Sequence, residues 1–478
     1  MLFNSVEFFL FFPVVFIIYW ILFRKKLKSQ NALLLISSYF FYSFWDYRFL
    51  ALLLFSTFLD FFSAQKIASS PNKSIKEIWL WLSIILNLGF LGFFKYCNFF
   101  VDSFASLLLN FGLKPHLWTL QIILPVGISF YTFHGLSYII DVYKERIKPE
   151  NNFIDYGLFV SFFPLLVAGP IERATHLLPQ IKKERIFSYS RSVDGLRQIL
   201  WGLFKKVVVA DNCAKYANII FNQSEDFSGS TLLFGALFFT FQIYCDFSGY
   251  SDIALGTARI LGFDLLKNFS FPYFSRDIAE FWRKWHISLS SWFRDYIYIP
   301  LGGSRVSKLK QVRNVFVIFL LSGFWHGANW TFLAWGFLHA IYFLPLLMLG
   351  KNRDNLNTNS TISILPKFRE VIHILTTFSL VVFAWIFFRA ESLTHAFNYI
   401  SEIFSSSLFT IPTYLPKRVF LFIFILMSIE WLGRNSNFAL EKFGLNWPKP
   451  IRLGFYYVLL FMIFYFSGED QQFIYFQF

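Results

Sequence analysis

Charged residues and cysteines are both scarce in this sequence. Charged side chains make up 15% of the 478 residues, where about 25% is usual for a soluble domain. The three cysteines, Cys97, Cys213 and Cys245, are too few and too scattered for a disulfide framework or a cysteine-based zinc site. Cys245, next to Asp246, is better explained as a small buried apolar residue than as a nucleophile. These shortages argue against a disulfide-stabilised secreted protein and against an ordinary soluble one.

The usual signatures of metal and nucleotide chemistry are missing as well. The sequence has no H-E-x-x-H, no aspartate-rich cluster, no P-loop and no G-x-S-x-G. We therefore expect no metal site and no tightly bound cofactor, and a metallohydrolase or NTPase finds no support. A cleavable signal peptide is not expected either, because the first apolar run lacks a basic segment before it and a small-residue cleavage site after it.

Apolar sequence is abundant. Hydrophobic residues make up 56% of the chain and the mean hydropathy is +0.51, and many apolar runs approach the ~20 residues that cross a ~30 Å hydrocarbon core. These runs predict an all-α polytopic membrane protein with about 11 transmembrane helices. Because such spans must pack laterally, we expect one integral membrane domain over residues 1–478. Within it we expect N-terminal helices at 1–118, a core at 119–349 and C-terminal helices at 350–478.

The distribution of positive charge also indicates a membrane protein. The net charge is +14, and Lys and Arg gather in short runs between apolar segments, such as RKKLK at 24–28 and KKER at 182–185. Such loops lie in the cytoplasm and attract anionic lipid head groups. We therefore expect membrane lipids as partners and no nucleic acid. The basic run after the first apolar segment places the N-terminus outside.

The stretch 281–335 carries the strongest functional signal. His326 lies in SGFWHGANW, near the middle of an expected, almost wholly apolar helix that breaks near Asn329 and Trp330. A charged, unpaired side chain at membrane depth costs roughly 2.5 kcal/mol or more, so an ionisable residue there marks a candidate site. Taken alone, helix packing explains the motif better, because its two glycines permit close approach and a histidine can hydrogen-bond between helices.

His286 is the second candidate, in EFWRKWHISLSSWFRDYIYIPLGG. At helical spacing it shares a face with Trp282 and Trp285. The cations around that face are Arg283, Lys284 and Arg294. An interfacial helix explains the tryptophans and cations, which gather at the head-group level, but it explains His286 less well. On this stretch alone the two interpretations are balanced.

Two further stretches place charges where apolar sequence gives way to polar sequence. Glu172 and Arg173 follow an apolar run broken by prolines and a glycine, with basic residues before and after it, which predicts a re-entrant hairpin with PIER at or near its tip. Asp246, in QIYCDFSGYSD, stands at the end of an expected span. A loop ion pair and a helix-end carboxylate are the simpler explanations, and a polar patch at a cavity entrance is the functional one. The remaining histidines are expected to be structural or exposed: His116, His134, His176, His339, His373 and His395.

Taken together, these motifs resemble one family. The motifs are FFPLLVAGPIERA, GLFKKVVVADN, QIYCDFSGYSDIALG, NFSFPYFSRDIAEFWRKWHISLSSWFRDYIYIPLGG, SGFWHGANWTFLAWG and the terminal FIYFQF. They look like the membrane-bound O-acyltransferase (MBOAT) family, and more narrowly its bacterial alginate O-acetylation branch. The resemblance covers nearly the whole chain and is weakest at 350–450. It implies a multi-pass protein of the bacterial cytoplasmic (inner) membrane, with helices in a ring and re-entrant or interfacial helices around a central channel.

The resemblance also implies a reaction. The family's invariant histidine corresponds to His326 and its second, partly variable polar residue to His286. An acyl group, acetyl in this branch, would pass from a cytoplasmic thioester such as acetyl-CoA or an acyl carrier to an acceptor outside. Periplasmic acetyltransferase partners would complete its transfer to an exopolysaccharide. His326 would act as general base or acyl relay, and His286 would orient the thioester or stabilise the oxyanion.

The other candidates would line the channel and hold the donor. The tryptophans Trp282, Trp285 and Trp330 would exclude water. The cations Arg276, Arg283, Lys284 and Arg294 would attract the donor's phosphates. The remaining polar lining would be Asn329, Asp246, Glu172 and Arg173. The alternatives are an O-acyltransferase that uses a carrier-protein thioester or a lipid or teichoic-acid-like acceptor, a transporter of a lipid-linked sugar, and an export scaffold.

Overall fold

Most of the chain folds into helices. The structure is a computed structural model and describes residues 1–113, 122–167, 169–356, 365–467, 471 and 473–474. Its elements are α-helices with π-helical and 3₁₀ turns at several of their ends, and no strand occurs among these residues. The predicted all-α class is therefore confirmed.

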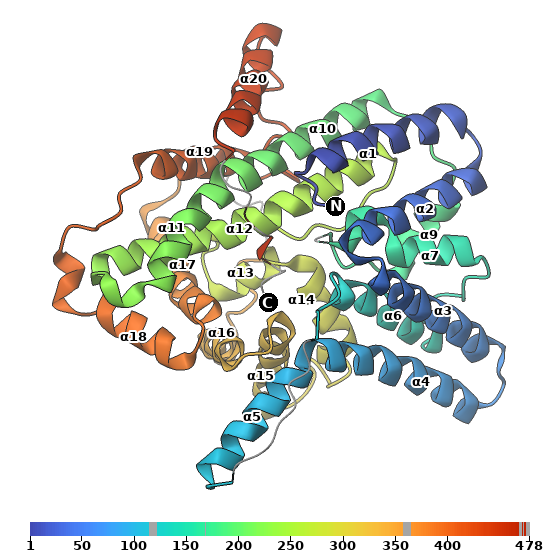
Figure 1. Cartoon of the computed structure of the whole chain (residues 1–478), viewed down its shortest axis with the longest axis horizontal. Coiled ribbons are helices and arrows are strands. Elements are labelled where there is room, and N and C mark those ends of the chain that lie inside the picture. Colours follow the sequence, from blue (N-terminus) through green and yellow to red (C-terminus); the bar gives the residue numbers. More distant parts are fainter. Residues whose placement is uncertain (114–121, 168, 357–364, 468–470, 472, 475–478) are drawn as a thin grey trace. The chain divides into compact units, whose positions relative to one another are not determined.

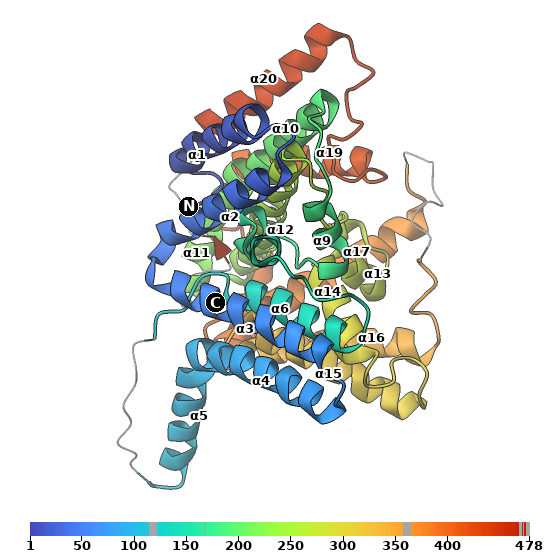
Figure 2. The same cartoon turned by 90° about the vertical axis from the view of Figure 1, so that its right-hand side faces the viewer.

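The chain folds into two compact units. The first consists of Met1–Val193 and Thr257–Leu266. Its helices are α1 (Val6–Ile17), α2 (Leu27–Asp46), α3 (Arg48–Ser69), α4 (Lys73–Leu91), α5 (Cys97–Asn110), α6 (Ile128–Tyr143), α7 (Phe153–Ser161), α8 (Phe163–Leu166) and α9 (Ala174–Lys182). Helices α3, α4 and α6 pack against one another (Figure 2). Asp60 of α3 joins two of them, because its carboxylate accepts hydrogen bonds from Ser83 (2.6 Å) and Asn87 (2.8 Å) of α4.

The second unit consists of Asp194–Gly256 and Lys267–Phe478. Its helices are α10 (Tyr189–Leu203), α11 (Asp211–Asn222), α12 (Gly229–Ile260), α13 (Ile278–Lys284), α14 (Ile287–Phe293), α15 (Lys308–His326), α16 (Trp330–Met348), α17 (Phe368–Arg389), α18 (Leu393–Ile403), α19 (Lys417–Gly433) and α20 (Lys449–Tyr465), of which α10 and α12 each extend across a unit boundary. Helix α16 packs against both α15 and α17 (Figure 1).

Glycines bring α10 and α12 into close contact. A Cβ added to Gly202 would lie 2.6 Å from the carbonyl oxygen of Gly249, and Gly195 and Gly256 meet in the same way about two turns away. Small residues at this spacing let two backbones approach, which is how helices in membranes commonly associate. The pair is therefore a rigid support for the side chains that it carries inward.

Five helical segments of the described chain are long and apolar enough to cross a membrane: Arg48–Ser69, Lys73–Asn110, Gly229–Ile260, Trp330–Met348 and Phe368–Arg389. Others that the sequence suggested as spans are shorter or begin with basic residues, as α15 does. The apolar stretch at 120–143 is helical from Ile128, and its first two residues lie outside the described ones. The count of about 11 therefore stays a prediction.

Candidate active site

The two candidate histidines lie together in the second unit. His326 is the last residue of α15, and His286 stands between α13 and α14. Their ring centroids are 6.4 Å apart, and the residues are 4% and 1% exposed. About forty positions separate them in the sequence, so tertiary packing brings them together.

The helix expected around His286 is broken at that residue. Helix α13 ends two residues earlier, α14 begins at Ile287, and His286 itself adopts a left-handed φ of +42°. Asn268, in the loop before α13, stabilises this break. The Ile287 N–H donates to the Asn268 carbonyl oxygen (2.8 Å), and the Ser288 hydroxyl donates to the Asn268 side chain (2.6 Å). The predicted helical face shared with the neighbouring tryptophans is therefore wrong. Hydrogen bonds across the loop, rather than helical periodicity, direct the imidazole.

His326 ends its helix instead of lying near the middle of it. The chain becomes extended at Gly327, and α16 begins at Trp330. The side-chain oxygen of Asn329 caps α16 by accepting a hydrogen bond from the Thr331 N–H (3.1 Å). The predicted break near Asn329 and Trp330 is confirmed, but it starts at Gly327. The imidazole consequently lies at a helix terminus, beside irregular backbone.

Close packing of α15 on α16 holds His326 in register. A Cβ added to Gly323 would overlap the Phe332 carbonyl oxygen of α16, and one added to Gly336 would overlap the Phe319 carbonyl oxygen of α15. Each helix therefore presents a glycine to the other's backbone. The contact lies within one turn of His326, so it fixes the height of the imidazole relative to α16.

Aromatic rings enclose both imidazoles. The His326 ring lies edge-on to Trp335 and Phe388, with a centroid distance of 5.2 Å to each. The His286 ring lies 4.7 Å from that of Phe247. Further rings of this wall are Trp325, Trp285, Trp385 and Phe269. An enclosure of this kind limits the access of water to the two imidazoles.

His339 also contacts this cluster, although its sequence context indicated only a structural or exposed residue. It is buried in α16, its ring lies 4.9 Å from Trp335, and its Nδ1 accepts a hydrogen bond from Trp282 Nε1 (3.2 Å). Trp335 and His339 are four residues apart on α16, so helical spacing counted from Trp335 could have found it.

Of the three tryptophans predicted to wall a channel, two belong to the cluster. Trp285 is buried with its ring 5.0 Å from Trp385, and Trp282 lies 5.6 Å from Trp335. Trp330 is 55% exposed at the start of α16, which does not fit the expected enclosure. The Asn329 side chain is engaged in hydrogen bonds near the surface. Besides capping α16, its amide donates to the Glu391 carbonyl oxygen after α17 (2.9 Å).

All four cations expected to attract the donor have partners within the protein, and that of Arg294 is the neighbouring Asp295 carboxylate at 2.8 Å. Arg276 and Lys284 both contact Glu280, at 3.0 and 2.9 Å. Burial alone would raise the pKa of Glu280, but the hydrogen bonds and charges of these two cations outweigh it and hold that pKa below its usual range. Arg283 donates to two carbonyl oxygens of the segment after α16. The charge that they offer a ligand is therefore reduced.

Arg294 lines a pocket of about 510 Å³ beside α15 and α16. Lys308 and Arg353 line it as well, and its described lining includes no carboxylate. Phe319 forms part of its apolar wall, and the Phe319 ring lies 5.1 Å from Trp282 of the aromatic cluster. We call this the basic pocket. It combines positive charge with an apolar side that reaches the rings around the histidines.

Glu172 and Arg173 belong to the first unit and are buried between α8 and α9. The Glu172 carboxylate accepts a hydrogen bond from the Leu266 N–H (2.6 Å) and contacts His176 Nδ1 (2.8 Å), while its own N–H donates to His134 Nε2 (3.0 Å). The hydrogen bond to Glu172 raises the pKa of His176. With these partners, Glu172 joins three segments of the chain.

Asp246 lies inside α12 rather than at a helix end. Helix α12 continues to Ile260, and the Asp246 carboxylate is buried against the Lys206 ammonium at 2.8 Å. The predicted helix terminus at this residue is therefore wrong.

Of the other histidines, His116 lies outside the described residues.

Known proteins share this sequence over most of its length. Residues 143–387 match the model of MBOAT, the membrane-bound O-acyltransferase family. The probable alginate O-acetylase AlgI of Pseudomonas aeruginosa is 40% identical over 403 residues, covering 84% of this chain and 74% of that protein. The peptidoglycan O-acetyltransferase of Helicobacter pylori is 39% identical over 426 residues, covering 83% and 78%.

A more distant relative is the teichoic acid D-alanyltransferase of Bacillus subtilis, which is 27% identical over 299 residues, covering 59% of this chain and 73% of that protein. The matched residues 143–387 include both histidines and most of the aromatic wall. These findings confirm the resemblance seen in the motifs. The chain belongs to the membrane-bound O-acyltransferase family and is a multi-pass membrane O-acyltransferase.

Proposed function

We propose that this protein takes an acetyl group from acetyl-CoA in the cytoplasm and delivers it to the outer side of the bacterial cytoplasmic membrane. Periplasmic acetyltransferase partners there complete the O-acetylation of an exopolysaccharide. The observation that carries the proposal is the buried pair of imidazoles, 6.4 Å apart within an aromatic wall. Relatives named as alginate O-acetylases and a peptidoglycan O-acetyltransferase support the acetyl group and the polysaccharide acceptor.

In this proposal His326 is the general base. Its imidazole takes the proton of the acceptor hydroxyl while the hydroxyl oxygen attacks the thioester carbonyl carbon. The carbon–sulfur bond then breaks, the acetyl group stays on the acceptor oxygen as an ester, and the thiolate leaves with the proton that the imidazolium returns. General-base catalysis of this kind is typically worth ~10²–10⁴-fold in rate. An N–H of His286 stabilises the oxyanion that forms in between.

The aromatic wall serves this chemistry by keeping water out. A thioester that meets water at an activated site is hydrolysed, and the acetyl group is lost. Rings such as Trp335, Phe388 and Phe247 pack edge-on against the imidazoles and leave them a low-dielectric surrounding, in which a hydrogen bond to the developing oxyanion is stronger than in water.

The basic pocket is the part of the site that we assign to the donor. Acetyl-CoA carries several negative charges, and Arg294, Lys308 and Arg353 surround a volume of about 510 Å³. The charged end of the donor can stay there, because only the acetyl end has to reach the histidines. The apolar side of the pocket, at Phe319, borders Trp282 and so leads toward the aromatic wall.

Acetyl transfer by purified protein in vesicles tests the base. His326→Ala should bind acetyl-CoA but lose at least about 100-fold in turnover, as expected when a general base is removed. His373→Ala is the matched control, because His373 is exposed in α17, and it should retain full activity. Substantial acetyl transfer by His326→Ala would reject the assignment of this residue as the base.

The donor pocket has its own test. Lys308→Gln removes one of the three cations of the basic pocket and should raise the KM for acetyl-CoA several-fold while changing kcat little, with a weaker effect at high salt. Lys449→Gln, at the exposed start of α20, removes the same charge elsewhere and should leave KM unchanged. Equal effects of the two substitutions would place the phosphates outside this pocket.

One alternative is a carrier-protein thioester as donor, and relatives named as teichoic acid D-alanyltransferases support a transferred group other than acetyl. The two histidines would perform the same chemistry, and only the donor surface would differ. Labelled acetyl-CoA supplied to inverted vesicles separates the two, because label appears in an acceptor only if free acetyl-CoA is the donor. A transporter of a lipid-linked sugar would cleave neither thioester.

A further inference from the structure

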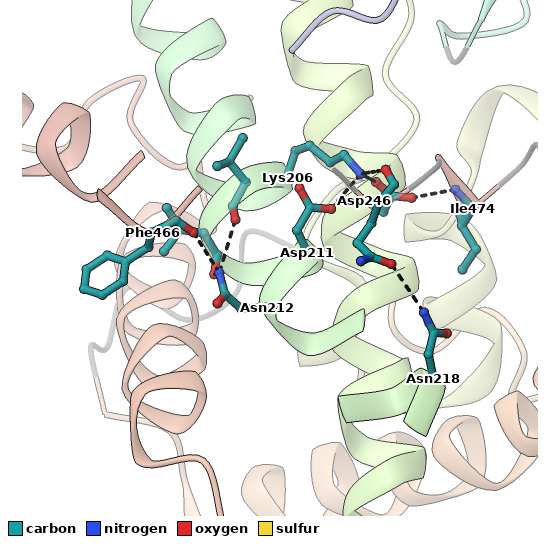
Figure 3. Close-up of polar contacts among 10 residues, drawn as sticks. Lys206, Asp211, Asn212, Asn218, Asp246, Phe466 and Ile474 are labelled. Carbon is teal, nitrogen blue, oxygen red and sulfur yellow. Dashed lines mark hydrogen bonds and ion pairs between the residues drawn. The ribbon is translucent and has the colours of Figure 1, made fainter. Parts of the chain in front are cut away.

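The chain returns to the interior of the second unit after α20. The described residues of this segment include Gln471, Phe473 and Ile474, and the last two are buried. Figure 3 shows Ile474 beside Asp246 of α12, and Phe466 at the start of the segment beside Asn212 of α11. We call this segment the tail. It belongs to the core, although it follows the last helix.

Three buried charges hold the tail. The Lys206 ammonium lies 2.8 Å from the Asp211 carboxylate and 2.8 Å from that of Asp246 (Figure 3). The Ile474 N–H donates to the second Asp246 oxygen (2.7 Å), and Lys206 also donates to the Gln471 carbonyl oxygen (3.2 Å). We call Lys206, Asp211 and Asp246 the tail clamp. Both ends of the ion pair thus also bind tail backbone.

Two asparagines of α11 extend the same attachment. The Asn212 amide donates to the Phe466 carbonyl oxygen (3.2 Å), and the Asn218 amide donates to the Gln471 side chain (3.4 Å). With the clamp, they give the tail hydrogen bonds along its described length. Buried backbone groups such as the Gln471 carbonyl oxygen and the Ile474 N–H need such partners, because they find no water in the interior.

The chemistry of the clamp suggests a positioning role. Buried ion pairs are poor stabilisers, since the cost of removing charges from water offsets their attraction, and apolar residues of similar volume often serve as well. A charged cluster is better suited to fixing one arrangement of the surrounding segments, because any other arrangement of those segments leaves a charge unpaired. One lysine faces two carboxylates here, and the Ile474 N–H supplies one further hydrogen bond to the excess negative charge.

The tail reaches the proposed catalytic site through two rings. The Phe473 ring lies 4.4 Å from Tyr250 and 6.3 Å from Phe247, both on α12. Phe247 in turn lies edge-on to His286 at 4.7 Å. His286 has a left-handed backbone that its surroundings must maintain. Side chains that pack against Phe247 therefore also support the position of the His286 imidazole.

We propose that the tail clamp positions His286 by holding Phe473 behind Phe247. The inference rests on the proposed function for the reaction that His286 serves. Lys206, Asp246 and Phe473 are then positioning residues, which act through Phe247 and touch no substrate. Releasing the clamp should let the imidazole move and admit water to it, while the basic pocket and its affinity for the donor stay as they are.

Two substitutions test the link between the clamp and His286 at its two ends. Asp246→Asn keeps the shape and the acceptor for the Ile474 N–H but removes the charge that faces Lys206. Phe473→Ala removes the ring and leaves the ion pair. Each should lower kcat for acetyl transfer about 10- to 100-fold, the range that small misplacements of a catalytic group produce, with the KM for acetyl-CoA within about twofold. Phe473→Leu should restore most of the loss.

A second readout does not depend on acetyl transfer. Diethyl pyrocarbonate carbethoxylates imidazoles that water can reach, and mass spectrometry of the His286 peptide reports its extent. Both substitutions should raise the modification of His286 at least fivefold and leave that of the exposed His373 unchanged. Phe221→Ala empties an equally buried site where the ring stacks on Tyr399, so it controls for loss of a buried ring and should change neither readout.

The outcomes are distinguishable. Folded Asp246→Asn protein with unchanged kcat and unchanged His286 modification would overturn the inference, as would an equal effect of Phe221→Ala. If Phe473→Ala fails to fold, judged by gel filtration in detergent, Asp246→Asn carries the test. If the wild type transfers no acetyl group, the proposed function fails, and His286 modification still decides whether the clamp shields the imidazole.

Discussion

Replacing Gly323 by alanine should damage the site by separating α15 from α16. The added Cβ would overlap the Phe332 carbonyl oxygen and lie 3.0 Å from the Phe332 carbonyl carbon. Carbon atoms pack at about 3.5 Å or more, so the helices must separate by about half an ångström to relieve the carbon contact alone. Both atoms belong to backbone, so a side-chain rotation cannot relieve the overlap.

The cost follows from that movement. Overpacking of a tight contact destabilises a protein by about 1–3 kcal/mol, which would appear as a lower melting temperature. Activity should suffer more, because His326 follows Gly323 within one turn and its ring lies 5.2 Å from Trp335 of the partner helix. Misplacement of a catalytic group by ~1 Å can cost about 100-fold. We expect kcat to fall 10- to 100-fold.

Melting in detergent and turnover of acetyl-CoA measure the two effects separately. Gly454→Ala is the control, because a Cβ at this position in α20 meets no described atom within 4 Å. It should leave turnover unchanged and stabilise the helix by up to about 1 kcal/mol. Wild-type melting and turnover in Gly323→Ala would refute the view that glycine packing sets the position of His326.

Two further predictions concern buried charge. Glu172 raises the pKa of His176 above its usual 6.5. The pair therefore stabilises the folded protein most below pH 6.5, and this contribution is lost as the pH rises through the raised pKa. The difference in melting temperature between wild type and His176→Asn should consequently shrink from about pH 6 to about pH 8.5. The effect is small since the His176 side chain is 38% exposed, and a constant difference would contradict it. Lys205 lies 2.6 Å from Asp252 in the interior, so Lys205→Met should cost about 3–5 kcal/mol and the double substitution with Asp252→Asn much less. Chemical denaturation of the single and double variants measures these losses of stability. Equal losses in the two variants would show that the ion pair does not stabilise the fold.

Composition and motif spacing were enough to predict the helical membrane class, the break near Asn329 and two candidate histidines that the fold brings together. They could also have shown that Arg276 and Lys284 are not simple donor-binding cations. Glu280 stands four residues from each of them, the spacing at which helical ion pairs form. That spacing is visible in the sequence and predicts that Glu280 offsets the charge of both cations.

Other features depend on contacts between distant segments and leave no local pattern. The bend at His286 requires Asn268 in the loop before α13. Phe388 reaches His326 from α17, an apolar helix in which no residue type stands out. Asp246 is held by Ile474, far along the chain. Periodicity indicates which face of a helix is buried but not which distant segment covers that face.

The left-handed backbone at His286 has a consequence for how the residue is studied. Alanine in that conformation costs about 1–2 kcal/mol through contact of its Cβ with the following carbonyl oxygen, whereas asparagine and glycine adopt it more readily. An alanine scan would therefore confuse the loss of an imidazole with a shift of the chain between α13 and α14. His286→Asn and His286→Gly remove the ring while sparing the bend, and comparison with His286→Ala separates the two. At this position the choice of replacement determines what the experiment measures.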